Sequence, residues 1–121
     1  MPTVKEQNPV TDLKALTREL RVDIIRMLEA AGSGHPGGSL SIIDILAALY
    51  TRVLRHRPAE PQWPDRDRLV LSKGHACPAL YAALYLRGFF DRAALGSFRR
   101  LGGLLQGSPT TTIPGIDATC G

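Results

Sequence analysis

The stretch LVLSKGHACPAL at residues 69–80 decides the local fold expected for this chain. Its apolar start predicts a short buried strand at residues 69–72, followed by a glycine turn. A helix is expected from about residue 76 to residue 87, with Pro78 in its first turn, where proline is favoured. A strand, a glycine turn and a helix N-terminus in this order direct backbone N–H groups toward one point, and His75 adds a side-chain donor. The stretch therefore predicts a site for an anion such as a phosphate group.

Two helices are expected before this stretch. Apolar residues recur at steps of three and four over residues 11–31, which predicts one amphipathic helix, ended by the glycine that follows it. Residues 32–38 hold four glycines, so their backbone can take positive φ and approach a ligand closely. The second helix is expected to begin at a cap formed by Ser39 or Ser41 and to end near Arg55.

The rest of the chain adds no second strand. Prolines at positions 58, 61 and 64 indicate a linker, Asp91 is expected to cap a short helix to about residue 101, and residues 102–121 show no periodicity. One buried strand does not make a parallel sheet, because such strands need neighbours on both sides. The pattern predicts an incomplete, helix-rich α/β domain over residues 11–121, preceded by a tail at residues 1–10.

The composition is that of a soluble globular domain or part of one. Of the 121 residues, 44% are apolar and 21% charged, which is enough for one hydrophobic core. The longest nearly uninterrupted apolar run, residues 76–86, is far shorter than the roughly 20 residues of a membrane-spanning helix. The N-terminus lacks a signal-peptide pattern, and Cys77 and Cys120 form no Cys-x-x-Cys pair. We expect a cytoplasmic protein with no membrane contact.

The formal net charge of +4 raises the question of a polyanionic partner. Arg52, Arg55, His56 and Arg57 cluster in the sequence. Acidic residues are interleaved with basic ones elsewhere, and no nucleic-acid-binding motif is present. A solvated basic face is the favoured interpretation, and no nucleic-acid partner is expected.

Four motifs, in order and in spacing, resemble the N-terminal part of transketolases. They read SGHPGG at residues 33–38, WPDRDR at 63–68, LSKGHA at 71–76 and PGIDATCG at 114–121. Four motifs in register are far more specific than any one alone. The chain is most similar to the N-terminal subunit of the split bacterial and archaeal form. The resemblance implies part of a thiamine-diphosphate-binding domain and an enzyme that transfers a two-carbon ketol unit between sugar phosphates.

The resemblance also implies roles for individual residues. His35 occupies the position of a catalytic histidine that faces the substrate oxygens at the reacting carbon. His75 occupies the position of a histidine beside the cofactor diphosphate, which agrees with the anion site expected from the residues themselves. The backbone at Gly115 and Ile116 is expected to pass close to the cofactor, with Asp117 in the acidic position of that loop.

Two departures from the family pattern matter. Ser108 stands where most relatives carry a substrate-binding histidine, and losing such a donor can slow a reaction on the order of 10²-fold. The family implies Mg²⁺, but the chain has no Gly-Asp-Gly segment and its one asparagine is Asn8, so the metal ligands are absent. We therefore expect the chain to be a truncated N-terminal fragment or subunit, inactive alone, and to act as a homodimer or with a C-terminal transketolase subunit.

Other interpretations are open. His35 and His75 suit loop or capping positions, and Cys77 beside His75 suggests a cysteine hydrolase, which is disfavoured because no third orienting group is evident. Asp65 and Asp67 are poor metal ligands because Arg66 and Arg68 stand beside them in the sequence. The main alternative is a noncatalytic remnant that serves as an interaction module through exposed apolar surface.

Overall fold

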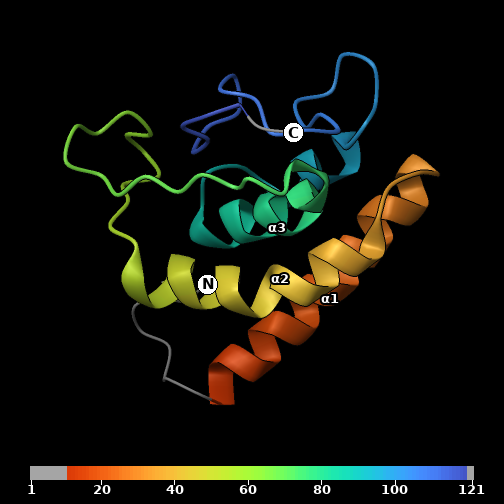
Figure 1. Cartoon of the computed structure of the whole chain (residues 1–121), viewed down its shortest axis with the longest axis horizontal. Coiled ribbons are helices and arrows are strands. Elements are labelled where there is room, and N and C mark those ends of the chain that lie inside the picture. Colours follow the sequence, from red (N-terminus) through yellow and green to blue (C-terminus); the bar gives the residue numbers. More distant parts are fainter. Residues whose placement is uncertain (1–10, 120–121) are drawn as a thin grey trace.

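The computed structural model describes residues 11–119 and contains three α-helices that pack against one another (Figure 1). They are α1 (Thr11–Ala31), α2 (Pro36–Ala48) and α3 (Cys77–Arg87). Three short helical turns complete the described elements: η2 (Leu49–Val53), η3 (Gly74–Ala76) and η4 (Arg92–Ser97). The helix predicted over residues 11–31 is confirmed at both ends, and the one predicted over residues 76–87 is confirmed to within one residue.

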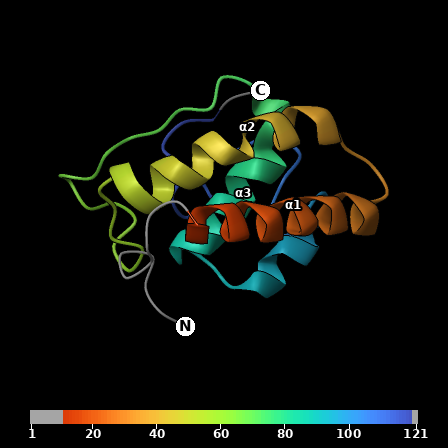
Figure 2. The same ribbon diagram turned by 90° about the horizontal axis from the view of Figure 1, so that it is seen from below.

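The core is centred on α3. All but two of its side chains are buried, as expected for a helix that is apolar on every side. α1 and α2 lie along one side of it, and the loops after η4 cover the other side (Figure 1). α1 contributes a single buried stripe with steps of four, four and three residues: Leu16, Leu20, Ile24 and Met27. Figure 2 shows α1 on the outside of the molecule, with α2 alongside.

The buried strand predicted at residues 69–72 is wrong for the part of the chain that the structure describes. The segment is extended but forms no ladder, and it appears in Figure 1 as a single pass in front of α3. Leu71 is buried, whereas the side chain of Val70 is 60% exposed. The reason is that a strand requires a neighbouring strand to pair its backbone groups, and residues 11–119 provide none. The helix-rich part of the prediction is confirmed.

The start of α2 also differs from the prediction. The helix begins at Pro36 with His35 as its N-cap, and neither Ser39 nor Ser41 caps it. Ser39 is fully buried inside the helix, and the Ser41 Oγ donates a hydrogen bond to the Gly38 carbonyl at 3.0 Å. Proline is pre-organised for the first turn of a helix, so Pro36 sets the start. The helical run ends with η2 two residues before Arg55, as expected.

The turn between α1 and α2 depends on glycine. Gly32 has a φ of +71° and its N–H bonds the carbonyl oxygens of Leu28 and Glu29, which ends α1 as predicted. Gly34 has a φ of +127°, and a Cβ there would collide with the Leu28 side chain. The turn places His35 at the start of α2.

The C-terminal third follows the prediction only in part. Asp91 precedes η4, but its side chain makes no capping bond, and η4 ends at Ser97 rather than near residue 101. Arg99 takes a φ of 57°, which breaks any helical continuation. Residues 102–119 form turns without a regular element, as expected. The described residues do not include the predicted tail at residues 1–10, which contains Asn8, or Cys120.

Within residues 11–119, no helix has both the length and the apolar character that crossing a membrane would require.

Candidate functional site

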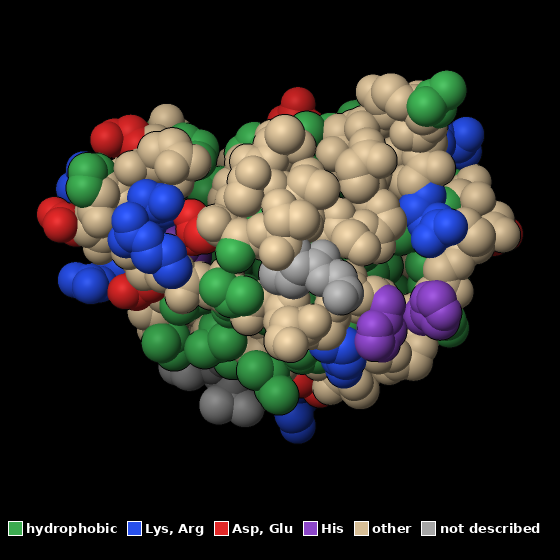
Figure 3. All heavy atoms as spheres, turned by 45° about the horizontal axis from the view of Figure 1, so that its top comes forward, with side chains coloured by type: hydrophobic (Ala, Val, Ile, Leu, Met, Phe, Trp, Pro, Cys, Tyr) green, Lys and Arg blue, Asp and Glu red, His purple; other side chains and the backbone are tan. Residues whose placement is uncertain are grey.

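His35 and His75 lie side by side on the surface. Their ring centroids are 5.7 Å apart and the rings are inclined at 71°, edge to face. Both residues are exposed, and Figure 3 shows the two histidine side chains adjacent on one face. The α1–α2 turn positions His35, and η3, which includes His75, positions the second ring. The structure therefore brings together the two histidines to which the resemblance gave roles at the site.

The start of α2 adds unpaired donors to this pair. No side chain caps the helix, so the backbone N–H groups of Gly37 and Gly38 have no capping acceptor. Nothing lies within 4 Å of a Cβ built at Gly37, and one built at Gly38 would touch the His75 ring at 3.6 Å. The two glycines leave the helix N-terminus open on the side of His75, an arrangement that suits an anion.

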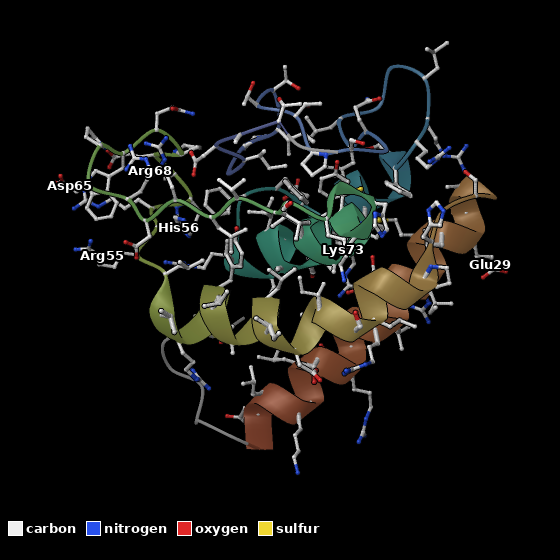
Figure 4. The ribbon with its side chains drawn as sticks, viewed as in Figure 1. Glu29, Arg55, His56, Asp65, Arg68 and Lys73 are labelled. Carbon is white, nitrogen blue, oxygen red and sulfur yellow. The ribbon has the colours of Figure 1, made fainter. Side chains whose placement is uncertain are left out.

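Lys73 is a third side-chain donor, and sequence reasoning did not assign it to the site. Its Nζ lies 3.4 Å from the Ser41 Oγ on α2, and Figure 4 shows it beside the start of α3. The ammonium group and Ser41 thus flank the same helix start as the histidines. Lys73 stands two positions before His75, and Pro36 indicates the true helix start, so both signals were present in the sequence. We name His35, Lys73, His75 and the first turn of α2 the histidine cluster.

Ser108 lies on a loop that is held against the first turn of α3. The Cys77 Sγ donates to the Gly107 carbonyl at 3.2 Å, and the Tyr81 hydroxyl donates to the Gln106 carbonyl at 2.7 Å. Ser108 itself is exposed. A surface hollow of about 420 Å³ adjoins this loop, lined by Arg99, Arg100, Leu101, Gln106 and Gly107. The loop and its arginines are therefore neighbours of the turn that follows His75.

The segment from Gly115 to Asp117 is placed away from the histidine cluster. A Cβ on Gly115, whose φ is +94°, would lie 2.8 Å from Leu84 Cδ2, and Leu84 is about 10 Å along α3 from Cys77. Ile116 is buried in the core. The structure does not bring these residues beside His35 and His75.

Asp117 is engaged by an arginine in the structure. Its Oδ1 accepts hydrogen bonds from Arg66 Nη2 at 2.7 Å and Nε at 3.0 Å. The two side chains are only 11% and 12% exposed. This partly buried pair joins the C-terminal loop to the segment before residue 69.

Cys77 has the properties of a buried core residue rather than a nucleophile. Its side chain is 1% exposed, and burial raises the pKa of the thiol to about 11. The thiolate is the reactive form of cysteine, so a raised pKa suppresses attack. The cysteine-hydrolase interpretation is therefore disfavoured, as the sequence indicated.

Carboxylates in the described part of the chain do not gather into a metal site. No group of three or more His, Cys, Asp or Glu side chains within residues 11–119 is arranged to hold a metal ion. Asp67 accepts bonds from Arg55, through the backbone N–H at 2.6 Å and Nη2 at 3.3 Å. The expected local partners, Arg66 and Arg68, bond elsewhere. Asp67 is therefore held by an arginine of its own loop rather than grouped with other carboxylates.

The basic cluster at residues 52–57 is tied to its own loop. Arg57 stacks on the Trp63 ring at 4.0 Å and pairs with Glu60 at 3.6 Å. His56 is buried, its Nε2 lies 2.8 Å from the Asp67 carbonyl oxygen, and burial lowers the pKa of its ring. Figure 4 places His56 toward the other end of the molecule from the histidine cluster. These contacts favour a structural role over nucleic-acid binding.

The donor set of the histidine cluster fits a phosphate or diphosphate group. Two imidazoles, one ammonium group and an open helix N-terminus are all donors, and phosphate oxygens are acceptors. Such a constellation binds and orients an anion without any nucleophile of its own.

Comparison with known proteins identifies the family. Residues 12–121 match the family model of the transketolase thiamine diphosphate binding domain. The chain belongs to the transketolase family. The chain matches the N-terminal region of transketolases, as the motifs suggested.

Relatives within the transketolase family include proteins named as subunits. The chain is 46% identical over 111 residues to the 6-deoxy-6-sulfo-D-fructose transketolase subunit of a Clostridium strain. It is 37% identical over 112 residues to an apulose-4-phosphate transketolase subunit of Phocaeicola vulgatus. These matches cover 91% and 93% of the chain but 40% of each relative.

Solved transketolases share the fold. The structure of the Campylobacter jejuni transketolase superposes with a TM-score of 0.86 at 36% identity, over 94% of this chain and 18% of that one. The chain therefore spans less than half the length of the transketolases that it matches.

Proposed function

We propose that the histidine cluster binds the diphosphate end of thiamine diphosphate and the reacting end of a sugar phosphate. The observation that carries the proposal is the pairing of His35 and His75 at 5.7 Å beside an uncapped helix start. The transketolase family membership supports it. When bound, thiamine diphosphate supplies the carbon centre that takes up and releases a two-carbon ketol unit.

In this proposal, His75 and His35 have separate tasks. His75 lies beside Lys73 and the first turn of α2, so it donates to a phosphate oxygen of the cofactor. His35, as the N-cap, stands at the rim of the same site and donates to substrate oxygens that gain negative charge during transfer. The loop of Gly115, Ile116 and Asp117 lies against α3, away from His35 and His75. These three residues are therefore proposed to contact the cofactor only if the loop moves away from α3.

Ser108 and the neighbouring arginines are proposed to contact the substrate. A serine hydroxyl reaches less far than the histidine most relatives carry, so Ser108 holds the substrate less firmly. Arg99 and Arg100 line the adjoining hollow, and guanidinium groups bind phosphate in a bidentate manner. This arrangement supports a sugar phosphate as the substrate class.

The chain is proposed to be inactive by itself. The Gly-Asp-Gly segment through which the family binds Mg²⁺ is not in this sequence, and a diphosphate without a divalent ion keeps most of its charge. Residues 11–121 are proposed to form part of one cofactor domain, completed by a C-terminal subunit or within a homodimer. Relatives that are named as subunits support such a partner.

An interaction module without catalysis is the alternative. Ile45, Val53 and Val70 are 59%, 62% and 60% exposed, and Figure 3 shows hydrophobic side chains gathered on one face. Exposed apolar surface of this kind favours association. Both proposals predict that a partner covers it, and they differ in whether the histidine cluster binds an anion.

Calorimetric titration of thiamine diphosphate with Mg²⁺ separates the two. We expect weak or no binding by the chain alone and saturable binding after it is mixed with a candidate C-terminal transketolase subunit. If neither sample binds the cofactor, the noncatalytic alternative is correct. If the chain alone binds tightly and catalyses transfer, the proposed need for a partner is wrong.

A further inference from the structure

The segment at residues 97–106 forms a loop that hydrogen bonds close at its base. The Arg99 N–H donates to the Leu105 carbonyl oxygen at 2.9 Å, and the Leu105 N–H donates to the Ser97 hydroxyl at 3.2 Å. Figure 1 shows this loop projecting beyond η4. We name residues 97–106 the arginine loop.

The backbone of the arginine loop takes conformations that side chains disfavour. Among the described residues, Arg99 is the one residue other than glycine with a positive φ, of 57°, and this region costs free energy for any residue with a Cβ. Gly102 has a φ of +78°, and the Gly103 N–H donates to the Arg100 carbonyl oxygen at 2.9 Å. A Cβ at Gly103 would collide with the Ser97 carbonyl oxygen. The tip of the loop is therefore fixed in shape before any partner binds.

The tip of the arginine loop presents apolar side chains to solvent. Leu101 is fully exposed, with a relative accessible area of 108%, and Leu104 is 38% exposed. An exposed leucine gains free energy when it is transferred to apolar surroundings. Because the loop is already ordered, a partner that buries Leu101 loses little conformational entropy. The tip has the properties of a preformed anchor for a binding partner.

Positive charge flanks Leu101 without a carboxylate nearby in the sequence. Residues 92–116 contain no Asp or Glu, and neither Arg99 nor Arg100 forms an ion pair among the described residues. The Arg100 Nη2 donates instead to the Ala30 carbonyl oxygen at 3.0 Å, at the end of α1. This acceptor carries no formal charge, so a partner at the tip meets a leucine between two cations.

We propose that Leu101 docks into an apolar pocket rimmed by Asp and Glu on the partner subunit that completes the enzyme. A buried apolar anchor within complementary charge supplies much of the binding free energy of protein interfaces. The choice of partner rests on the proposed function, in which a C-terminal subunit completes the cofactor domain.

The tip also adjoins the hollow proposed for the substrate. Arg99, Arg100 and Leu101 line this hollow of about 420 Å³ together with Gln106 and Gly107. A subunit seated on Leu101 would therefore cover the hollow from one side. Docking at the arginine loop thereby links assembly of the enzyme to closure of the substrate site.

Other occupants fit the tip less well. A second copy of the chain offers pockets of the wrong charge, since each hollow described on its surface is lined by more Lys and Arg than Asp and Glu. A nucleic acid would meet the arginines but leave Leu101 in water. A membrane would bury Leu101, but one leucine is smaller than an acyl chain, which by itself binds membranes only marginally.

The test measures association of the full chain with a candidate C-terminal transketolase subunit by sedimentation velocity. Leu101→Asp should weaken association at least about tenfold, because it places a carboxylate in an apolar pocket with an acidic rim. Ile25→Asp, the matched change at a 46% exposed residue of α1, should leave it within about twofold. No association of the wild type, or equal effects of the two variants, overturns the proposal.

The charge of the rim is tested separately. Arg99→Asn removes one cation and keeps a residue type that tolerates positive φ. It should weaken association by about fivefold at low salt and by less at high salt, because salt screens the attraction. Circular dichroism should be unchanged in Arg99→Asn, Leu101→Asp and Ile25→Asp, since all three side chains are exposed. Association of the wild type that does not depend on salt overturns the acidic rim.

A second readout separates this inference from the proposed function. Pyrophosphate binding by the mixture reports on the histidine cluster, and His75→Gln should weaken it while leaving association unchanged. If association does not depend on Leu101 but pyrophosphate binding depends on His75, the docking surface is wrong and the proposed function stands. If association depends on Leu101 but no pyrophosphate is bound, the docking surface stands and the proposed function is wrong.

Two further measurements exclude other occupants. Self-association of the chain that is lost in Leu101→Asp would assign the tip to a second copy. Cosedimentation with phosphatidylserine vesicles that is lost in the same variant would assign it to a lipid surface. Either result overturns the proposed docking of a partner subunit.

Discussion

The rings of His35 and His75 lie 5.7 Å apart, edge to face, although forty residues separate them in the chain. The contact joins the N-cap of α2 to η3, so one anion bound there would receive donors from both elements. Because His35 lies at the end of a glycine turn and His75 lies within η3, the backbone rather than a side-chain network sets the distance between the two rings. The predictions that follow begin with this pair.

His75→Gln should weaken binding of inorganic pyrophosphate by about tenfold. A charge-assisted hydrogen bond contributes about 1.5–3 kcal/mol, and 1.4 kcal/mol corresponds to a factor of ten. Calorimetric titration of the chain mixed with the candidate C-terminal subunit measures the effect, with Ser72→Ala as a control on the same segment. Equal affinities of the wild type, His75→Gln and Ser72→Ala for pyrophosphate would show that His75 does not bind the anion.

Asp117→Asn should destabilise the chain by about 3 kcal/mol, because it leaves the guanidinium of Arg66 in a poorly solvated place without a counter-charge. Urea unfolding followed by circular dichroism gives the free energy of unfolding. The double variant Arg66→Met with Asp117→Leu should recover most of the loss. A single variant as stable as the wild type would indicate that Asp117 serves a ligand instead of the fold.

The sequence predicts the helices well and the site in part. The apolar spacing of α1 and the glycine after it were sufficient to predict both ends of this helix, since a helix forms its backbone hydrogen bonds within its own segment. The strand at residues 69–72 could not be confirmed in the same way, because a strand needs a partner that residues 11–119 do not supply. Pairing of Asp67 with Arg55, instead of its neighbours Arg66 and Arg68, depends on where the loop folds back, which no local pattern encodes.

The motifs identified His35 and His75, whereas the placement of Lys73 beside Ser41 on α2 was found only in the structure, although Lys73 and Pro36 stand within the same motifs. Ser39 and Ser41 are good capping residues, yet Pro36 begins the helix three positions before Ser39. Capping preference alone predicted that α2 begins at Ser39 or Ser41. In the structure α2 begins at Pro36, and Ser39 is buried within the helix.

Stability should fall as the pH drops below about 6.5, the ordinary pKa of histidine. Burial lowers the pKa of His56 in the folded chain, so the unfolded chain binds its proton first and the folded state loses stability as pH falls from 6.5 toward the folded pKa. Tyr50 and Phe89 pack on its ring, and Asp67, Arg87 and Asp117 supply the surrounding charge. Urea midpoints at neutral and mildly acidic pH measure the effect.

His56→Gln should flatten that pH dependence, whereas His35→Gln, at an exposed histidine, should preserve it. The same slope in His56→Gln and in the wild type would show that another group is responsible.

Cys77 should resist alkylation in the folded chain. With a pKa of about 11, its thiolate is scarce at pH 8, and its reaction with iodoacetamide should be on the order of a hundredfold slower than that of a free cysteine. Mass spectrometry of the Cys120→Ser variant, with and without urea, measures both rates. Rapid labelling without urea would show that the thiol is accessible and would reopen the nucleophile interpretation.

The central claim is that His35 and His75 serve transketolase chemistry once the rest of the enzyme is present. A hybrid in which residues 12–121 replace the matching part of the Campylobacter jejuni transketolase tests it directly, by ketol transfer between sugar phosphates. The account predicts transfer by the hybrid, none by the chain alone, a loss of at least about 10²-fold in kcat/KM for His35→Gln or His75→Gln, and no change for Arg57→Glu. A folded hybrid whose histidine variants keep the full rate, or transfer by the chain alone, would contradict it.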